Sequence, residues 1–341
     1  MSDPKPAPAP SVPAEVFQTE AWFSNLLLHG FVNTPTVVQL RVSSAAGDVS
    51  LSLMLANGGR ELHALGNYYT SMYGPIGRAD ALDAEEWRSF ACNLHALPGS
   101  AVVQLQPLDA SSEWLAALEA ALCAQGYWCD RFFCFGNWYQ PVPIGGFSVY
   151  WAGRPSALRH SVERGRRRLT KAGTWRTEIT STESPALESA IAAYETVYAQ
   201  SWKQPEPCSG FMPGLIRTAA REGWLRLGVL WLNDQPLAAQ VWLVHGGKAN
   251  IYKLAYVQGF ERLSAGSVLT TALMQHTMDV DCVQEVDYLS GDDAYKADWM
   301  ALRRERVGLL AFDKRHWRGW LAAAPHGLGR LRQWIFSKGK R

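Results

Sequence analysis

The strongest constraint on the fold is a run of three strand-like segments in the second half of the chain. They span residues 225–232, 237–245 and 248–256, and only short turns such as Gly246-Gly247 separate them. Connections of this length can join only antiparallel neighbours in a sheet. Beyond them we expect, in order, a helix ending near Asp281, a strand at 283–289, a short helix after Gly291 and a strand at 306–312. This order predicts a mixed α/β fold with a mostly antiparallel sheet flanked by helices.

The first half of the chain predicts a second, similar lobe. Strand-like segments between residues 37 and 65 are separated by Ala-Gly-Asp and Asn-Gly-Gly turn signals, and a helix at 84–97 follows with Asp83 as its N-cap. The length of 341 residues is also close to two units of ordinary domain size. We therefore expect a disordered leader at 1–15, an N-terminal lobe at 16–145, a C-terminal lobe at 146–315 and a basic aromatic tail at 316–341.

Composition excludes several classes of protein. Hydrophobic residues make up 48% of the chain and charged residues 19%, with a formal net charge of +2, so the chain is not intrinsically disordered. The same near-neutral balance argues against DNA as a partner. The six cysteines form no C-x-x-C pair, so no metal site is expected. The N-terminus has no apolar signal-peptide core, which predicts a cytoplasmic protein.

A short motif after the third strand has the character of an anion site. Ser264-Ala265-Gly266-Ser267 lies between that strand and the helix that follows. The free N–H groups of a helix start placed at a strand end favour a phosphate or pyrophosphate group. The alternative is an ordinary helix cap in which small residues allow close packing.

The second lobe resembles the GNAT acyltransferase superfamily, and within it the branch related to FemAB proteins and cellulose-biosynthesis-associated acetyltransferases. The resemblance covers about residues 154–313. It implies two GNAT-like lobes in tandem, of which the first is a degenerate copy that shapes the acceptor pocket. The segments that carry it are Gly223–Gly228, Pro236–Gln240, Ile251–Tyr256, Ser264–Ser267 and Asp287–Lys296.

The resemblance implies acyl-CoA as a co-substrate, with no permanently bound cofactor. The donor-binding residues that it implies are Tyr256, Arg262, Ser264, Ala265, Gly266 and Ser267. Only one glycine of the family's usual Arg/Gln-x-x-Gly-x-Gly/Ala loop is kept, so an acyl carrier protein or an aminoacyl-tRNA stays open as the donor.

Amide formation needs an acid for the leaving thiolate and a base for the amine. Tyr295 matches the tyrosine that GNAT enzymes often use as the acid, and a core aromatic is the alternative. Asp287 and Asp292 lie in a cluster of carboxylates that should raise one another's pKa, which favours a base, whereas a helix N-cap is the alternative. The expected substrate-binding residues are Tyr69, Tyr73, Glu206, Gln240, Lys253 and Lys296.

The sequence thus predicts an N-acyltransferase that acts on an amine, with a sphingoid base, as in ceramide-type lipid synthesis, as one acceptor suggested by the resemblance. A small-molecule or sugar-amine acetyltransferase, a FemX-like aminoacyl transferase and a non-catalytic scaffold are the alternatives. Two basic regions predict peripheral attachment to the anionic inner membrane: Arg164–Arg168 in a helix at 156–172, and the tail, which has six Lys or Arg residues and no acidic ones. A solvated helix face and a packed tail are the competing interpretations.

Overall fold

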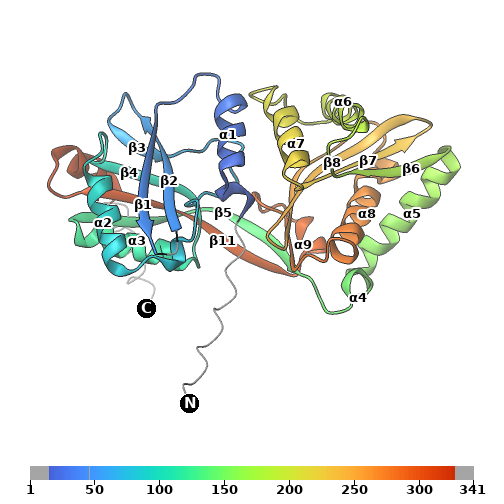
Figure 1. Ribbon diagram of the computed structural model, residues 1–341. Helices are drawn as coiled ribbons and strands as arrows, with labels where there is room; N and C mark the ends of the chain where they lie inside the picture. The colour runs from blue at the N-terminus through green and yellow to red at the C-terminus, as the bar shows by residue number, and fades with distance from the viewer. Residues whose placement is uncertain (1–14, 46, 327–341) are drawn as a thin grey trace, which may run out of the picture. The chain divides into compact units, whose positions relative to one another are not determined.

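The computed structural model describes residues 15–45 and 47–326 and divides the chain into two compact units (Figure 1). Unit 1 consists of residues 1–19, 140–204 and 216–287, and unit 2 of residues 20–139, 205–215 and 288–341. Residues 1–14 of the predicted leader and the part of the tail beyond residue 326 lie outside the described residues. Both units combine helices with a mixed sheet, so the predicted α/β class is confirmed.

The sheet of unit 1 has the strand order β10-β9-β8-β7-β6. Its strands are β6 (Trp175–Thr180), β7 (Leu225–Leu232), β8 (Gln235–His245), β9 (Lys248–Tyr256) and β10 (Glu285–Asp287). Strands β6 to β9 are antiparallel neighbours, which confirms the predicted meander, and β10 runs parallel to β9. Both two-residue turns have positive φ angles, at Asn233 and Asp234 and at Gly246 and Gly247, as tight antiparallel hairpins require.

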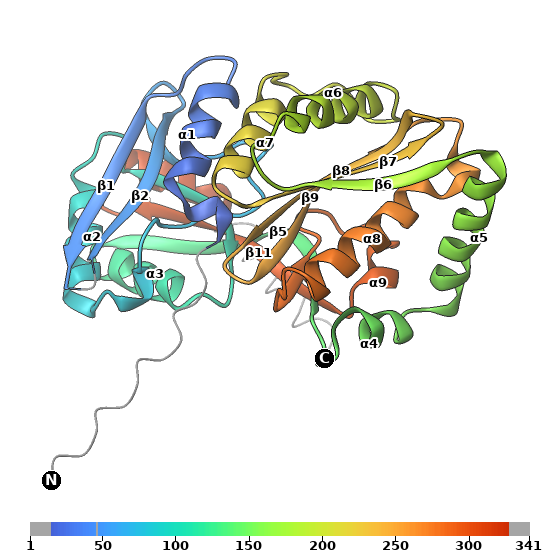
Figure 2. The same cartoon turned by 45° about the vertical axis from the view of Figure 1, so that its right-hand side comes forward.

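Helices cover both faces of this sheet. Helix α6 (Ala186–Ala199) lies on one face, and α8 (Ala265–Asp279) with α5 (Ser156–Ala172) lies on the other (Figure 2). The short helix α4 (Gly146–Ala152) also packs on α8, and α7 (Phe211–Arg221) crosses from unit 2 into unit 1. Because it is covered twice, β8 is buried along most of its length.

The sheet of unit 2 has the strand order β1-β2-β3-β4-β11-β5. Its strands are β1 (Val37–Ser44), β2 (Gly47–Ala56), β3 (Glu61–Ala64), β4 (Val102–Asp109), β11 (Leu302–Asp313) and β5 (Tyr127–Pro141), the last of which ends in unit 1. Strand β11 differs from expectation. The sequence places it in the second lobe, but it pairs antiparallel with β4 and β5. Its apolar segment Leu309–Phe312 is buried there, a long-range contact that no local pattern encodes.

The helices of unit 2 include α1 (Glu20–His29), α2 (Ala84–His95), α3 (Glu113–Ala124) and the one-turn α9 (Lys296–Trp299), and residues 317–326 are also helical. The predicted cap of α2 is confirmed, because the Asp83 carboxylate accepts hydrogen bonds from the backbone N–H groups of Glu85 and Glu86. Glu86 completes a capping box by accepting from the Asp83 N–H. Helix α1 was not predicted.

The two units repeat one order of elements. In unit 2, three antiparallel strands lead into α2 and then into β4, which is parallel to β3. In unit 1, three antiparallel strands lead into α8 and then into β10, which is parallel to β9. This repeat confirms the predicted tandem of similar lobes. Over the residues that the structure describes, no helix combines the length and apolarity needed to cross a bilayer.

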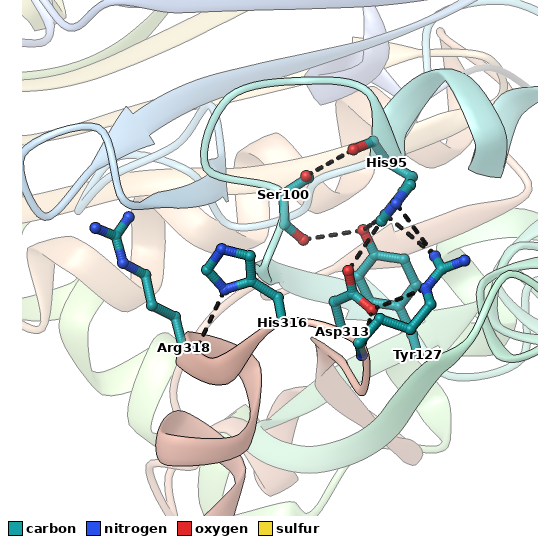
Figure 3. Close-up of polar contacts among 7 residues, drawn as sticks. His95, Ser100, Tyr127, Asp313, His316 and Arg318 are labelled. Atoms are coloured by element: carbon teal, nitrogen blue, oxygen red, sulfur yellow. Dashed lines mark hydrogen bonds and ion pairs between the residues drawn. The ribbon is translucent and has the colours of Figure 1, made fainter.

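A polar cluster fixes the end of β11 in unit 2 (Figure 3). The buried Tyr127 hydroxyl donates to the Ser100 carbonyl at 2.9 Å and lies 3.2 Å from His95 Nδ1. The Asp313 carboxylate is 3.5 Å from the same nitrogen and accepts a hydrogen bond from the Arg315 N–H. Burial raises the pKa of Tyr127 to about 12, so the hydroxyl remains a donor at neutral pH. We interpret this cluster as an anchor for the chain that follows β11.

Candidate active site

The turn between β9 and α8 builds a helix start that has no side-chain cap. After β9 ends at Tyr256, a short 3₁₀ helix (Glu261–Leu263) leads to Ser264, whose φ of 52° is left-handed. The Ser264 side chain makes no capping hydrogen bond, and the first helical bond runs from Val268 N–H to Ser264 O at 3.0 Å. Helical geometry therefore gives no acceptor within the helix to the N–H groups of Ala265, Gly266 and Ser267. These groups and the helix dipole favour an anion.

Gln240 of β8 holds this helix start in place. Its Nε2 donates to the Gly266 carbonyl at 3.0 Å and to Thr270 Oγ1 at 2.8 Å, and its Oε1 accepts from Trp242 Nε1 at 2.9 Å. The side chain is only 1% exposed. The sequence suggested Gln240 as a substrate contact, but its polar atoms are committed to the protein, so it acts as a positioning residue for α8.

Replacing Gln240 with leucine is expected to lower the free energy of unfolding by about 1–3 kcal/mol, because Trp242 Nε1 then loses its partner while buried. Urea unfolding measures the change, with Gln258→Leu, at an exposed position, as the control. A Gln240→Leu protein as stable as the wild type would contradict the positioning role.

Helix α5 brings positive charge and close packing to the same turn. Arg168 Nη1 donates to the Arg262 carbonyl at 2.6 Å. Gly165 allows α5 to pack closely against this turn, since a Cβ at this position would lie only 2.8 Å from the Leu263 carbonyl oxygen. The side chain of Arg262 is itself exposed. Because the Arg168 guanidinium brings positive charge to this turn, the local potential also favours an anion.

The Tyr256 ring lies beside the first turn of α8. A Cβ on Gly266 would lie 3.4 Å from it, which is ordinary contact. Tyr256 in turn contacts Trp202, with the ring centroids 4.4 Å apart. Lys253, further back on β9, has its Nζ 6.0 Å from the centroid of the Tyr252 ring. The structure thus brings the predicted donor residues Tyr256, Ser264, Ala265, Gly266 and Ser267 together in unit 1.

The predicted carboxylate cluster differs from expectation. Asp292, in unit 2, forms a two-pronged ion pair with Arg303, with 2.6 Å between Nη2 and Oδ2, and accepts from Trp138 Nε1 at 2.8 Å. Arg303 therefore lowers the pKa of Asp292, and the expectation that crowding raises it is wrong. Asp287, at the end of β10 in unit 1, is buried opposite Asn250 of β9.

Tyr295 and Lys296 lie at the start of α9 in unit 2. Tyr295 is 45% exposed and packs edge-on against Tyr288, with 5.9 Å between ring centroids. Desolvation, helped by the charge of Asp293, raises the pKa of Tyr295 to about 12, so its hydroxyl stays protonated at neutral pH. Lys296 is buried and donates from Nζ to the Ser290 carbonyl at 2.6 Å and to the Gly291 carbonyl at 3.1 Å. It therefore supports the loop before α9 from within.

The predicted acceptor residues of unit 2 are mostly structural. The Tyr69 hydroxyl accepts from the Cys208 N–H at 2.9 Å, and its ring stacks on Phe211 at 3.8 Å. Burial raises the pKa of Tyr69, and the nearby charge of Glu206 adds to the effect. Tyr73 is fully buried and donates to the Ser52 carbonyl at 2.6 Å. Tyr69 fixes the loop containing Glu206, and Tyr73 belongs to the core.

Sequence reasoning missed two residues that determine the state of Asp292. Arg303 and Trp138 lie on β11 and β5, and only the pairing of those strands brings them to one carboxylate. No spacing in the sequence indicates either contact. Within the described part of the chain, no group of three or more His, Cys, Asp or Glu side chains is arranged to hold a metal ion.

Comparison with known proteins supports this description. A family model described as an acetyltransferase (GNAT) domain matches residues 156–297, from the start of α5 to the start of α9. A search of curated protein sequences finds no match.

Solved structures share the fold at low sequence identity. FemX aligns at 10% identity with a TM-score of 0.64, covering 88% of this chain and 92% of that chain. The C-terminal domain of a putative lysylphosphatidylglycerol synthetase from Agrobacterium fabrum aligns at 13% identity with a TM-score of 0.53, covering 80% of this chain and 84% of that chain. L-PGS from Bacillus licheniformis aligns at 13% identity with a TM-score of 0.50, covering 93% of this chain and 98% of that chain. Residues 156–297 thus carry a GNAT acetyltransferase domain, as the resemblance predicts, and the chain shares its fold with FemX.

Proposed function

We propose that this protein is an N-acyltransferase that moves an acyl group from a CoA thioester to an amine. The observation that carries the proposal is the open start of α8, where three N–H groups without a helical acceptor follow a left-handed Ser264. The residues there are small, so a pyrophosphate can approach the backbone. Arg168 and the neighbouring basic side chains of α5 would add electrostatic attraction.

We assign roles to individual residues within this proposal. Tyr256, Arg262 and the segment from Ser264 to Ser267 bind the donor. Tyr295 protonates the leaving thiolate, and its hydroxyl carries the proton at neutral pH because its pKa is raised to about 12. Asp287 orients the amine or its water. Asp292 is held in an ion pair with Arg303 and supports the loop before α9 instead of acting as the base.

We further propose that the acceptor amine belongs to a lipid, such as a sphingoid base, and that the protein works at an anionic membrane surface. Residues 317–326 are helical and pack through Ala322 and Ala323 on the core of unit 2. The outer face carries Trp317 and Trp320, which are 62% and 63% exposed, and Leu321. Arg318 lies over the Trp317 ring at 5.3 Å. Exposed tryptophan beside arginine is typical of interfacial segments.

Vesicle binding tests the membrane part of the proposal. Vesicles of phosphatidylcholine mixed with phosphatidylglycerol should sediment the protein, and phosphatidylcholine alone should not. Trp317→Ser with Trp320→Ser should reduce binding about tenfold, whereas Val32→Ser, at another exposed apolar position of unit 2, should not change it. If the wild type and all variants bind the anionic vesicles equally, this surface does not mediate membrane binding.

Thiol release from a series of acyl-CoA donors, acetyl to palmitoyl, tests the reaction itself. Release that requires sphinganine in detergent and favours long chains would support lipid N-acylation. Thiol release from acetyl-CoA alone, with glucosamine as the acceptor, would indicate that the acceptor is a sugar amine. FemX and the lysylphosphatidylglycerol synthetase are similar in fold, so aminoacyl-tRNA is the competing donor. Transfer from it with no thiol release from any acyl-CoA would contradict the proposal.

A further inference from the structure

We propose that unit 2 contains a separate binding site for an uncharged ligand that joins an apolar group to an amide or similar polar group. The site is a cavity of about 440 Å³ lined by residues of β2, β3, β4 and β5 and of the loop after β3. It lies within unit 2 and contains none of the donor residues of α8. The proposal concerns binding alone and goes beyond the acyltransferase function.

An irregularity in strand pairing forms one wall of this cavity. In β11, Val307 pairs with Leu108 of β4 and Leu309 pairs with Leu105, so Gly308 faces two residues, Gln106 and Pro107. Both of these residues line the cavity. A β-bulge of this kind bends the strand and redirects its side chains, and bulges are common beside functional sites.

The strand on the other side of Gly308 is irregular at the same level. In β5, Phe135 pairs with Arg306 and Phe133 pairs with Val307, so Cys134 is an extra residue between them. Cys134 also lines the cavity, and its sulfur lies 3.8 Å from Gln106 Oε1 on the opposite bulge. The bulges on β4 and β5 therefore turn toward each other across the glycine, and the cavity lies where they meet.

The apolar part of the lining includes three aromatic rings and a methionine. Phe132, Phe133 and Phe135 contribute from β5, and Met54 contributes from β2. Phe133 is 56% exposed, although it lies in the middle of a strand. The Phe132 ring lies over Gly308, where any Cβ would overlap it. These side chains offer an apolar surface to an alkyl chain or an aromatic ring.

The polar part of the lining is made of neutral groups. Among the described residues, the carboxamide of Gln104 makes no hydrogen bond, and Gln106 uses only its oxygen, for the weak contact with Cys134. Both amides can therefore donate to and accept from a ligand. They place a polar group of the ligand next to β4, beside the aromatic surface of β5.

The charge balance of the lining selects against ionic ligands. The lining residues include no Lys, Arg, Asp or Glu, and the basic His63 is already 2.8 Å from the Glu61 carboxylate. Burial raises the pKa of the Cys134 thiol to about 11, so it is neutral at pH 7. A phosphate or an ammonium group would lose hydration here without gaining a partner. The cavity and the start of α8 thus suit opposite classes of ligand.

The volume sets the size of the bound group. A volume of about 440 Å³ lies within the range of roughly 300–1,000 Å³ that is typical of small-molecule sites. A ten-carbon chain with a terminal amide fits this volume. Decanamide is therefore a suitable probe, and N-phenethylacetamide is its aromatic counterpart.

Ligand-observed saturation-transfer NMR without any acyl donor tests the site, so the result does not depend on the proposed reaction. We expect decanamide or N-phenethylacetamide to bind, and decanoate and decylammonium, which carry a charge, to bind about tenfold more weakly. The amide that binds best identifies the apolar group as a chain or a ring. Equal binding of the charged and neutral probes, or no binding of either amide, would overturn the proposal.

Variants locate the binding. Phe133→Ala should weaken it about tenfold, and the side chain is exposed enough for the fold to tolerate the change. Gln104→Glu should weaken amide binding and strengthen that of decylammonium, a reversal that loss of folding cannot produce. Tyr68→Ala removes an exposed aromatic ring of unit 2 that does not line the cavity, so it should bind like the wild type. Unchanged binding in both cavity variants would overturn this location.

Discussion

Gly266→Glu is expected to weaken acyl-CoA binding by about 100-fold while the protein remains folded. Gly266 lies in the first turn of α8, where a carboxylate interacts favourably with the helix dipole and a non-glycine residue improves helix propensity. The same carboxylate would occupy the position proposed for the donor pyrophosphate and repel it. Stability and binding should therefore change in opposite directions, and calorimetric titration with acyl-CoA alongside urea unfolding measures both.

Two matched variants separate charge from size at this position. Gly266→Gln has the size of glutamate without its charge, and Gly266→Ala adds a single methyl group that the structure accommodates beside Tyr256. We expect Gly266→Ala to change the affinity for acyl-CoA by less than about threefold. The affinity of Gly266→Gln should lie between those of the alanine and glutamate variants. Acyl-CoA binding by the glutamate variant equal to that of the alanine variant would show that no anion binds here.

Tyr295→Phe is expected to reduce kcat by about 100-fold or more with little change in KM, because only the transition state needs the proton. The ring packing against Tyr288 is kept, so the fold should not change. Steady-state thiol release measures the effect. Tyr68→Phe, at another exposed tyrosine of unit 2, is the control.

The pH profile provides an independent check on Tyr295. Its pKa is raised from 10.0 to about 12, and the protonated form is the proposed acid. Raising the pKa extends that form to higher pH, so loss of this proton should cause no fall in rate up to pH 10. Wild-type turnover retained by Tyr295→Phe would remove the tyrosine from the mechanism.

The elements that could be predicted are those with local signals. The meander from β7 to β9 follows from apolar runs joined by two-residue turns, and Asp83 identifies the start of α2. The sheet to which β11 belongs is not a local property. Its burial against β4 and β5 depends on residues more than 160 positions away, so the sequence placed it in the wrong lobe.

The candidate site divides in the same way. The start of α8 could be predicted because a strand, a turn of small residues and a helix follow one another directly. The environment of each polar side chain could not be predicted from the sequence. Gln240 and Tyr73 have residue types typical of binding sites but are buried with their polar groups bonded to the protein. The pKa of Asp292 depends on Arg303, which reaches it from a neighbouring strand.

Comparing an acyl-CoA with the matching acyl-pantetheine tests the central claim most directly. The two share the thioester and the amide arm, but acyl-pantetheine lacks the pyrophosphate that we assign to the start of α8. Calorimetric titration should show acyl-pantetheine binding at least about 100-fold more weakly, and Gly266→Glu should narrow that difference. Equal affinity of the wild type for the two ligands, or no binding of either, would contradict the assignment of α8 as the donor site.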